Sequence, residues 1–334
     1  MNEDFEPLKE TQILHSGFFH WIVERHETYR NRLKGLPFGE WSDDPVLESY
    51  KFTNPFREND TATIWMREHF VTHNPDDMTL SNNVLNAALF RMVGTTQFAR
   101  EFIDRHGWIT QENFSPNLIK EIIQRRIDTK QRCFTGAYIV TNQGIKAPKS
   151  EVVIDKFITP LVEGVAGVLP RSLDSNFNLE QLHKWLLLFK GFGGGGFMAY
   201  EVVSDVLYMP NIWVKGAVDG RSIPSDRYTW ANAGPGALRG LNRIWGRFLT
   251  KRMSSTEALA KMKHLLSYKK LIAEVSVERG YKPINPTDID MRCIEHSLCE
   301  YDKYMRVTEG QGRPRSVCKY KEGEVYPVLR GPVE

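Results

Sequence analysis

Side chains that could do acid–base chemistry are concentrated between residues 290 and 306, in the sequence DMRCIEHSLCEYDKYMR. Glu295 and Glu300 could each accept a proton as a general base. Lys303 could stabilise negative charge that develops on a leaving group, and His296 could contact a substrate. Together these four side chains would give one helix a catalytic face.

The same segment also fits an ordinary solvated helix. Its apolar residues recur at helical spacing and could form a buried face: Ile294, Leu298, Tyr301 and Met305. Its charged residues include three i,i+4 pairs, a spacing that stabilises exposed helices: Asp288 with Arg292, His296 with Glu300, and Asp302 with Arg306. Charge spacing alone favours this second account.

A further carboxylate, Asp226, stands in a polar segment just before an aromatic stretch. Asp226 is a candidate general base, and the adjacent Arg227 is a candidate for stabilising charge. Tyr228 and Trp230 follow closely and could contact a base. An Asp in such a context is also commonly a helix cap or a turn residue, so both interpretations stay open.

The glycines Gly193, Gly194, Gly195 and Gly196 separate two predicted amphipathic helices, at 179–190 and 196–208. A glycine-rich turn allows close approach to another molecule, and the N–H groups at the start of the next helix suit a phosphate. This pattern predicts a helix-hairpin-helix grip on a DNA backbone. The alternative is a tight turn with no ligand. The segment is not a P-loop, because no Lys-Ser or Lys-Thr follows the glycines.

An aromatic and polar block lies near the N-terminus, in the sequence SYKFTNPFREND. Its aromatic residues could stack on an extruded base, and Arg57, together with Arg67 further on, could bind phosphate. Asn59 and Asp60 are candidate polar contacts to the same substrate. The alternative, which the physics alone favours, is a helix start whose aromatic side chains fill the core.

Helices must position these residues, because most of the chain has helical periodicity. The predicted helices lie at about 18–33, 59–70, 83–104, 117–131, 179–190, 196–208, 254–278 and 288–307, with Ser254 and Thr287 as the caps of the last two. One small β-hairpin is expected at 137–144, and 211–237 is expected to be irregular. The fold class is therefore mainly α. A boundary near residue 150 would separate 1–150 from 151–334, unless the two parts form one wrapped domain.

The composition is that of a globular protein. The 334 residues are 41% apolar, and 44 basic and 41 acidic residues give a net charge of only +3. The longest uninterrupted apolar run covers 185–189, far short of the roughly 20 residues of a membrane helix. The four cysteines form no CxxC pair, so we predict no zinc site. The acidic N-terminus lacks the features of a signal peptide, and we expect a cytoplasmic chain with reduced thiols and no membrane contact.

Several of these blocks, taken together, resemble a family from phages with hypermodified thymine. The similar stretches are FFHWIVERHETYR, DPVLESYKFTNPFREND, GFGGGGFMAYEVVSD, DRYTWANAGPGALRGLNRI and IEHSLCEYDKYMRVTEGQGRPR, which together span about residues 18–315. The family comprises the α-glutamyl/putrescinyl thymine pyrophosphorylases, or amino acid:DNA transferases, and its helical domain also occurs in 5-hydroxymethyluracil DNA kinases. Since the chain has no Walker A motif, it resembles the helical transferase rather than the fused kinase.

The resemblance implies a helix-hairpin-helix, DNA-glycosylase-like helical fold. It also implies transfer of an amino acid or polyamine onto the 5-methylene of pyrophosphorylated 5-hydroxymethyluracil in double-stranded DNA. Pyrophosphate would be released, and Mg²⁺ is the candidate cofactor for that release. The alternatives are a DNA glycosylase or a non-catalytic DNA-binding module. The excision alternative is weakened because Phe197 stands where bifunctional glycosylases have a lysine, and because no four-cysteine iron–sulfur pattern is present. If the chain is phage-encoded, its compartment would be the cytoplasm of the infected bacterium.

Overall fold

The computed structural model describes residues 6–69, 79–136, 139–165, 167–170, 173, 176–209, 226–311 and 317–325. The chain divides into two compact units. Unit 1 combines Met1–Asp60 with Arg227–Glu334, and unit 2 is Thr61–Asp226. The division therefore falls at 60/61 and 226/227, whereas the sequence suggested a boundary near residue 150.

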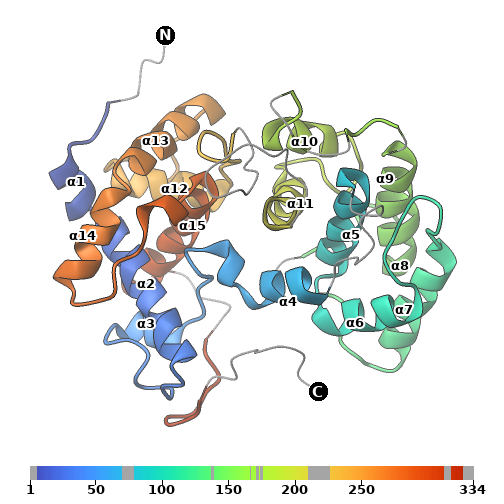
Figure 1. Ribbon diagram of the computed structural model, residues 1–334, viewed down its shortest axis with the longest axis horizontal. Coiled ribbons are helices and arrows are strands. Elements are labelled where there is room, and N and C mark those ends of the chain that lie inside the picture. The colour runs from blue at the N-terminus through green and yellow to red at the C-terminus, as the bar shows by residue number, and fades with distance from the viewer. Residues whose placement is uncertain are drawn as a thin grey trace. The chain divides into compact units, whose positions relative to one another are not determined.

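Helices dominate both units, and Figure 1 labels them in chain order. Unit 1 contains α1 (Glu10–His15), α2 (Phe18–Leu33), α3 (Pro45–Ser49), the 3-10 turn η1 (Arg57–Asn59), α12 (Pro235–Ile244), α13 (Ser255–Ser267), α14 (Lys270–Glu278), the 3-10 turn η5 (Pro286–Asp288) and α15 (Met291–Thr308). Unit 2 contains α4 (Thr61–His69), α5 (Leu80–Val93), α6 (Thr96–Arg105), α7 (Pro116–Asp128), α8 (Lys149–Glu151), the π-helical η3 (Val152–Ile158), α9 (Thr159–Gly164), α10 (Leu179–Leu186) and α11 (Phe197–Tyr208). The prediction of a mainly α fold is confirmed.

The predicted β-hairpin is represented only by its turn. Ile145 N donates to Asn142 O at 3.0 Å, and both Gln143 and Gly144 have positive φ angles, as in a hairpin turn. Residues 139–141 are not in a strand, and 137–138 lie outside the described residues. The described part of the chain contains isolated β-bridges, such as Tyr50 with Val317, but no strand.

Two long predicted helices are each divided into two. The predicted helix 83–104 is α5 followed by α6, because Gly94 ends α5 with a φ of 75° and the Thr95 side chain caps α6. The predicted helix 254–278 is α13 followed by α14, which are separated at Tyr268 and Lys269. The first break is fixed by local residues, Gly94 and Thr95, whereas no side-chain cap among the described residues marks the start of α14.

Of the two helix caps predicted in the last part of the chain, one is confirmed and one is wrong. Ser254 caps α13 by accepting a hydrogen bond from Glu257 N at 3.1 Å, as expected. The last helix is capped by Asp290, which accepts from Cys293 N at 2.9 Å. Thr287 instead belongs to η5, so the prediction that Thr287 caps the last helix is wrong.

The helices α12 and α15 lie side by side in unit 1 (Figure 1). A Cβ atom at Gly240 of α12 would lie 2.4 Å from the backbone oxygen of Leu298 in α15, so only glycine permits this approach. The sequence interpretation did not anticipate α12, because its first residues belong to a segment rich in Gly, Pro and Asn. Pro235 in fact occupies the first turn of the helix, where its missing N–H costs nothing.

One continuous helical stretch covers residues 149–164, and its middle part, η3, is π-helical. Pro160 lies two residues after the end of this part and has no N–H to donate to a carbonyl of the preceding turn. A change in hydrogen-bond pattern before a proline is one way for a helix to continue. The predicted domain boundary near residue 150 therefore falls within a helical part of unit 2.

Two further findings bear on the chemistry of the chain. None of the helices among the described residues is both long and apolar enough to cross a membrane. All four cysteines are free thiols. Burial raises the pKa of all four: to about 11 for Cys133, to about 12 for Cys299, and above the ordinary value for Cys293 and Cys318. These thiols are therefore not activated nucleophiles.

Candidate functional site

The Asp290 carboxylate, at the start of α15, accepts hydrogen bonds from two different groups. Asp290 is fully buried, and its Oδ1 caps the helix while its Oδ2 accepts a hydrogen bond from Arg227 Nε at 2.8 Å. Met291 N also donates to Arg227 O, at 3.2 Å. The predicted substrate residue Arg227 is thus fixed beside the N-terminus of α15, and part of its guanidinium is exposed.

One turn further along α15, Glu295 forms a buried ion pair. Arg292 Nη1 lies 2.8 Å from Glu295 Oε2, and the residue Glu295 is only 6% exposed. The second carboxylate oxygen, Oε1, lies 3.5 Å from the backbone N of Gly234, the residue that precedes α12. A carboxylate removed from bulk water and held by a cation is a common arrangement in active sites, although it also occurs in structural networks.

The segment that contains η1 packs against α15 within unit 1. Arg57 Nη1 donates to Asp60 Oδ2 at 2.7 Å, and Asp60 Oδ1 accepts from both the backbone N and the side chain of Asn54. Asn54 also donates to Asn59 O at 3.0 Å, which closes the loop. The predicted residues Arg57, Asn59 and Asp60 therefore form one bonded unit next to α15.

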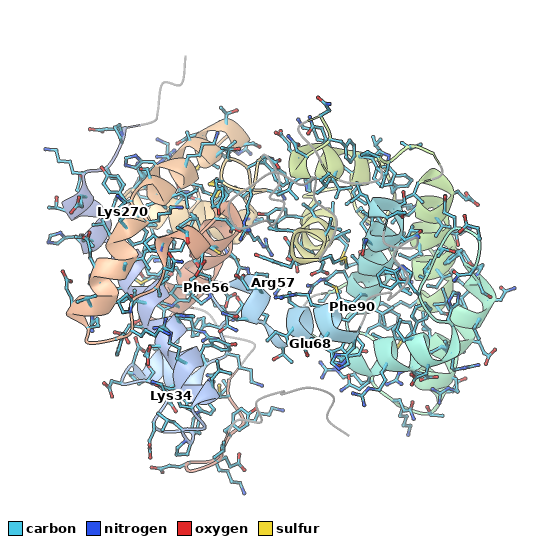
Figure 2. All side chains as sticks on the ribbon, in the orientation of Figure 1. Lys34, Phe56, Arg57, Glu68, Phe90 and Lys270 are labelled. Carbon is cyan, nitrogen blue, oxygen red and sulfur yellow. The ribbon has the colours of Figure 1, made fainter. Side chains whose placement is uncertain are left out.

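The aromatic residues of this block are part of the core. Phe56 is labelled beside Arg57 in Figure 2, and its ring lies against His26, with a centroid distance of 4.8 Å. The ring of Phe52 makes an edge contact with Trp21 at 6.2 Å. Both phenylalanines are buried, which fits a packing role and leaves no exposed face for stacking on an extruded base.

The predicted residues Glu300 and Lys303 bind the backbone just before η1. Glu300 Oε2 accepts from Thr53 N at 2.9 Å, and Lys303 Nζ donates to Lys51 O at 2.6 Å. The ammonium group of Lys303 also lies 4.9 Å from the centre of the Phe52 ring. These contacts give the two side chains a positioning role for residues 51–53. His296 is half-buried on the same helix.

The aromatic stretch after Asp226 is partly buried. The Tyr228 hydroxyl donates to Thr287 O at 3.3 Å, and Lys269 Nζ lies 4.9 Å from the centre of its ring. Burial raises the pKa of the Tyr228 hydroxyl above its ordinary value. Trp230 is half-buried as well. Tyr228 and Trp230 belong to unit 1, which also contains Glu295.

Asp226 itself caps a helix of unit 2. Its Oδ1 accepts from Leu179 N at 3.1 Å and its Oδ2 accepts from Glu180 N at 2.9 Å, at the N-terminus of α10. Asn178 supplies the third bond by accepting from Gln181 N. Burial raises the pKa of Asp226, while the two backbone N–H groups act in the opposite direction. The geometry matches the capping interpretation that the sequence left open.

The glycine turn lies between α10 and α11, as predicted. Gly196 has a φ of 70°, and its carbonyl is 3.2 Å from Nε2 of the buried His183. Among the residues that the structure describes, no side chain caps α11. A Cβ at Gly194 or Gly195 would meet no other atom within 4 Å, so these residues stand on the open side of the turn.

Two exposed apolar side chains flank this turn. Phe197 is 54% exposed and Leu188 is 78% exposed. Arg67 is exposed in the last turn of α4 and makes no ion pair with the described residues. Arg67 belongs to unit 2 and Arg57 belongs to unit 1, so the contacts of each arginine are given within its own unit.

Two buried ion clusters were not predicted from the sequence. In unit 2, Arg91 of α5 binds Asp205 of α11 through two guanidinium nitrogens, and its Nη1 lies 3.5 Å from Glu201 Oε2. In unit 1, the fully buried Asp302 pairs with Arg239 and Arg243 of α12 at 2.8 and 3.0 Å. Their partners are separated by 59 to 114 residues in sequence, so spacing along one helix gave no signal.

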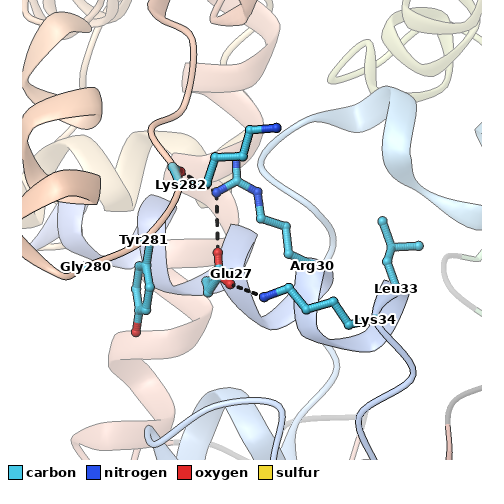
Figure 3. A pocket seen from close by; sticks show the side chains of 7 residues that line it. All are labelled: Glu27, Arg30, Leu33, Lys34, Gly280, Tyr281 and Lys282. Carbon is cyan, nitrogen blue, oxygen red and sulfur yellow. Dashed lines mark hydrogen bonds and ion pairs between the residues drawn. The ribbon is translucent and has the colours of Figure 1, made fainter.

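A hollow of about 390 Å³ opens in unit 1 between α2 and the segment that follows α14 (Figure 3). It is lined by Glu27, Arg30, Leu33, Lys34, Gly280, Tyr281 and Lys282. Glu27 accepts from both Arg30 and Lys34, and Arg30 also donates to Lys282 O. The hollow is thus lined mainly by groups that already bond to one another.

The described residues contain no group of three or more His, Cys, Asp or Glu side chains that could hold a metal ion. A Mg²⁺ ion in hard oxygen coordination commonly takes one or two protein carboxylates and the phosphates of a substrate. A site of that kind needs no group of three protein ligands, so the predicted Mg²⁺ cofactor stays a prediction.

Comparison with known proteins places the chain in a family. Residues 12–313 match the family described as the helical domain of 5-hmdU DNA kinase. The chain is also 26% identical over 319 residues to the 5-hmdU DNA kinase of Bacillus phage SP10, in an alignment that covers 88% of this chain and 45% of that protein. The chain thus spans less than half the length of this relative, and no solved structure matches it. Since the family match covers most of the chain, this protein belongs to the family of the 5-hmdU DNA kinase helical domain.

Proposed function

We propose that this chain takes part in thymine hypermodification by transferring an amine donor onto pyrophosphorylated 5-hydroxymethyluracil in DNA. The donor is an amino acid or a polyamine, and pyrophosphate is released. The relative from phage SP10 is named for a kinase of this modified base, so a related chain acting on the same base is a natural partner in one pathway. The observation that carries the proposal is the buried Arg292–Glu295 pair beside the start of α12.

The transfer requires three events at the 5-methylene carbon. The amine nitrogen attacks this carbon and forms a C–N bond, while the C–O bond to pyrophosphate breaks and the pyrophosphate leaves with the electron pair. The amine must also lose a proton, for which Glu295 is our first candidate base. Arg292, Arg57, Arg227 and Lys303 are the candidate cations for the charge of the leaving group. Asp226 is the second candidate base, since both of its oxygens already accept backbone hydrogen bonds.

The substrate in this proposal is double-stranded DNA that carries the modified thymine. The glycine turn Gly193–Gly196 and the first N–H groups of α11 would hold a backbone phosphate in a helix-hairpin-helix grip. The methylene carbon would be reached by flipping the base out of the duplex, as in DNA glycosylases. Tyr228, Trp230 and His296 are then the candidate contacts to the flipped base, and Arg67, Asn59 and Asp60 contact the DNA or the donor.

A second candidate function is a non-catalytic one. The match is to a helical domain, the alignment covers 45% of the SP10 kinase, and the chain has no Walker A motif. A domain of this kind could bind modified DNA and present its base to the active site of another polypeptide. In that case the buried Arg292–Glu295 pair would serve stability or base recognition, and Glu295 would accept no proton from a donor.

One experiment separates these functions. The chain is incubated with pyrophosphorylated hydroxymethyluracil DNA and a pool of amino acids and polyamines, and the DNA is then digested and its nucleosides are analysed by mass spectrometry. A nucleoside whose mass has increased by a donor supports transfer. Abasic sites would instead support excision. Tight DNA binding with no new nucleoside, for every donor tested, would contradict the transferase proposal and favour the binding domain.

A further inference from the structure

The turn at residues 246–252, which joins α12 to α13, is held rigidly by one buried side chain. Asn242 is 1% exposed, and its Nδ2 donates to Leu249 O at 3.2 Å and to Lys251 O at 2.9 Å. The backbone O of Asn242 accepts from Arg247 N at 2.8 Å. Lys251 N in turn donates to Phe248 O at 2.9 Å. These four hydrogen bonds hold the backbone of the turn in one conformation.

This turn presents a large apolar ring to solvent. Phe248 is 87% exposed, which is the highest exposure of any large apolar side chain among the described residues. The ring stands on a turn whose backbone is held by four hydrogen bonds, so its Cα is fixed in position while its face stays open to solvent.

The charges around the turn are predominantly positive. Lys251 and Arg252 are exposed and form no ion pair with the residues that the structure describes. The nearby carboxylate of Glu257 is bound by Arg247 and by the ammonium group of the buried Lys261, at 3.6 Å. Burial lowers the pKa of Lys261, and the positive charges of Arg247 and Lys251 lower it further. The surroundings of Phe248 therefore favour an anionic partner.

We infer that the 246–252 turn binds single-stranded DNA, with the Phe248 ring stacked on a base and Lys251 and Arg252 on the flanking phosphates. Aromatic rings among cations are the usual means of binding an unpaired strand, because every base has a face on which a ring can stack. The inference rests on the proposed function only for the choice of DNA as the partner. It assigns a contact with unpaired nucleotides outside the Arg292–Glu295 site.

The test is the binding of a fluorescein-labelled, unmodified 12-nucleotide strand, measured by fluorescence anisotropy at several salt concentrations. F248A should weaken binding by about 5- to 100-fold and leave the salt dependence unchanged, because it removes stacking but no charge. K251Q/R252Q should reduce the slope of log K against log[salt] by about 1.4, since each phosphate contact to a single strand contributes about 0.7. The effect of F248A should be much smaller on a blunt duplex, which offers few unstacked bases.

Matched controls come from the same unit. V277A removes another exposed apolar side chain, and K282Q/K319Q removes two exposed charges. Equal affinity of F248A and V277A for the single strand would overturn the inference. So would unchanged DNA binding by F248A together with a loss of self-association in sedimentation, which would make the turn a protein contact. Because no chemistry is measured, failure of the transferase proposal would leave this result unaffected.

Discussion

Arg292 and Glu295 lie one turn apart in α15 and form an ion pair of 2.8 Å in which both side chains are almost completely buried. Removing a charge from water is costly, and loss of one partner leaves the other uncompensated. Removal of one charge therefore destabilises the fold whatever the catalytic role of the pair, and a test of that role has to separate the two effects.

Glu295→Gln keeps the size of the side chain and removes its ability to accept a proton as a carboxylate. If Glu295 is the general base, single-turnover transfer should slow by about 100- to 10,000-fold, with DNA affinity within twofold of the wild type. Stability should also fall by about 3–5 kcal/mol, because the buried Arg292 loses its ion pair with Glu295. Denaturant unfolding and rapid-quench kinetics measure the two effects.

Two variants control this experiment. Arg292→Leu combined with Glu295→Leu removes both charges, so stability should largely return while transfer stays low. Glu300→Gln changes a carboxylate that binds Thr53 N, and its transfer rate should stay close to that of the wild type. A near-native rate for Glu295→Gln would refute the assignment of the base.

Asp226→Asn tests the helix cap. Asparagine offers only one acceptor oxygen to the two N–H groups of Leu179 and Glu180, so unfolding free energy should fall by about 1 kcal/mol. The transfer rate of the folded variant should remain within a few-fold of the wild type. Native stability combined with a loss of rate above 100-fold would instead make Asp226 the base.

The glycine turn can be tested with neighbouring substitutions that differ in their steric consequences. Gly195→Asp places a negative charge on the open side of the turn and should weaken DNA binding without unfolding the chain, whereas Gly195→Asn should have a smaller effect. Gly196→Ala should destabilise the chain by about 1–2 kcal/mol, because φ is positive there and Cβ would approach His183 Nε2 to 2.8 Å. Unchanged DNA affinity of Gly195→Asp, with a native circular dichroism spectrum, would exclude the turn from DNA binding.

The pH dependence of stability should contain a contribution from His26. Burial and two neighbouring arginines lower its pKa from 6.5 to about 3, and Nδ1 has no hydrogen-bond partner among the described residues. Between these two values the unfolded chain binds a proton that the folded chain does not, so stability decreases as the pH falls from 6.5 toward 3. His26→Gln should reduce this slope by about 1.4 kcal/mol per pH unit in urea titrations. An identical slope for the variant would contradict the prediction.

Sequence periodicity correctly predicted those helices and buried faces in which the local helical pattern agrees with the tertiary packing. The prediction of a helix at 18–33 is confirmed by α2, which ends next to Gly35 as expected. Ile294, Leu298 and Tyr301 are buried, and Asp302 pairs with Arg306, as the spacing along α15 predicted. All of these features depend on residues within a few turns of one another.

Features that depend on distant residues could not be predicted. Gly240 lies in a helix because α15 packs closely against it, although the residue type suggests a loop. The capping bonds of Asp226 reach helix α10, 46 and 47 residues earlier in the chain. The sequence could propose Asp226, Glu295 and Arg57 as chemical groups, but only the tertiary structure shows which protein groups already bind them.

The division of unit 1 into two separated segments has a consequence for synthesis on the ribosome. Unit 2 is continuous in sequence, so all of its residues can emerge and fold before α12–α15 have been made. Helix α2 has to wait longer for its partner, because Phe18 packs against Tyr301 and the Tyr301 hydroxyl binds Ser16 O across 285 residues. The core of unit 1 can therefore be completed only after the whole of unit 2 has been synthesised, and the apolar face of α2 stays without its native partner until then.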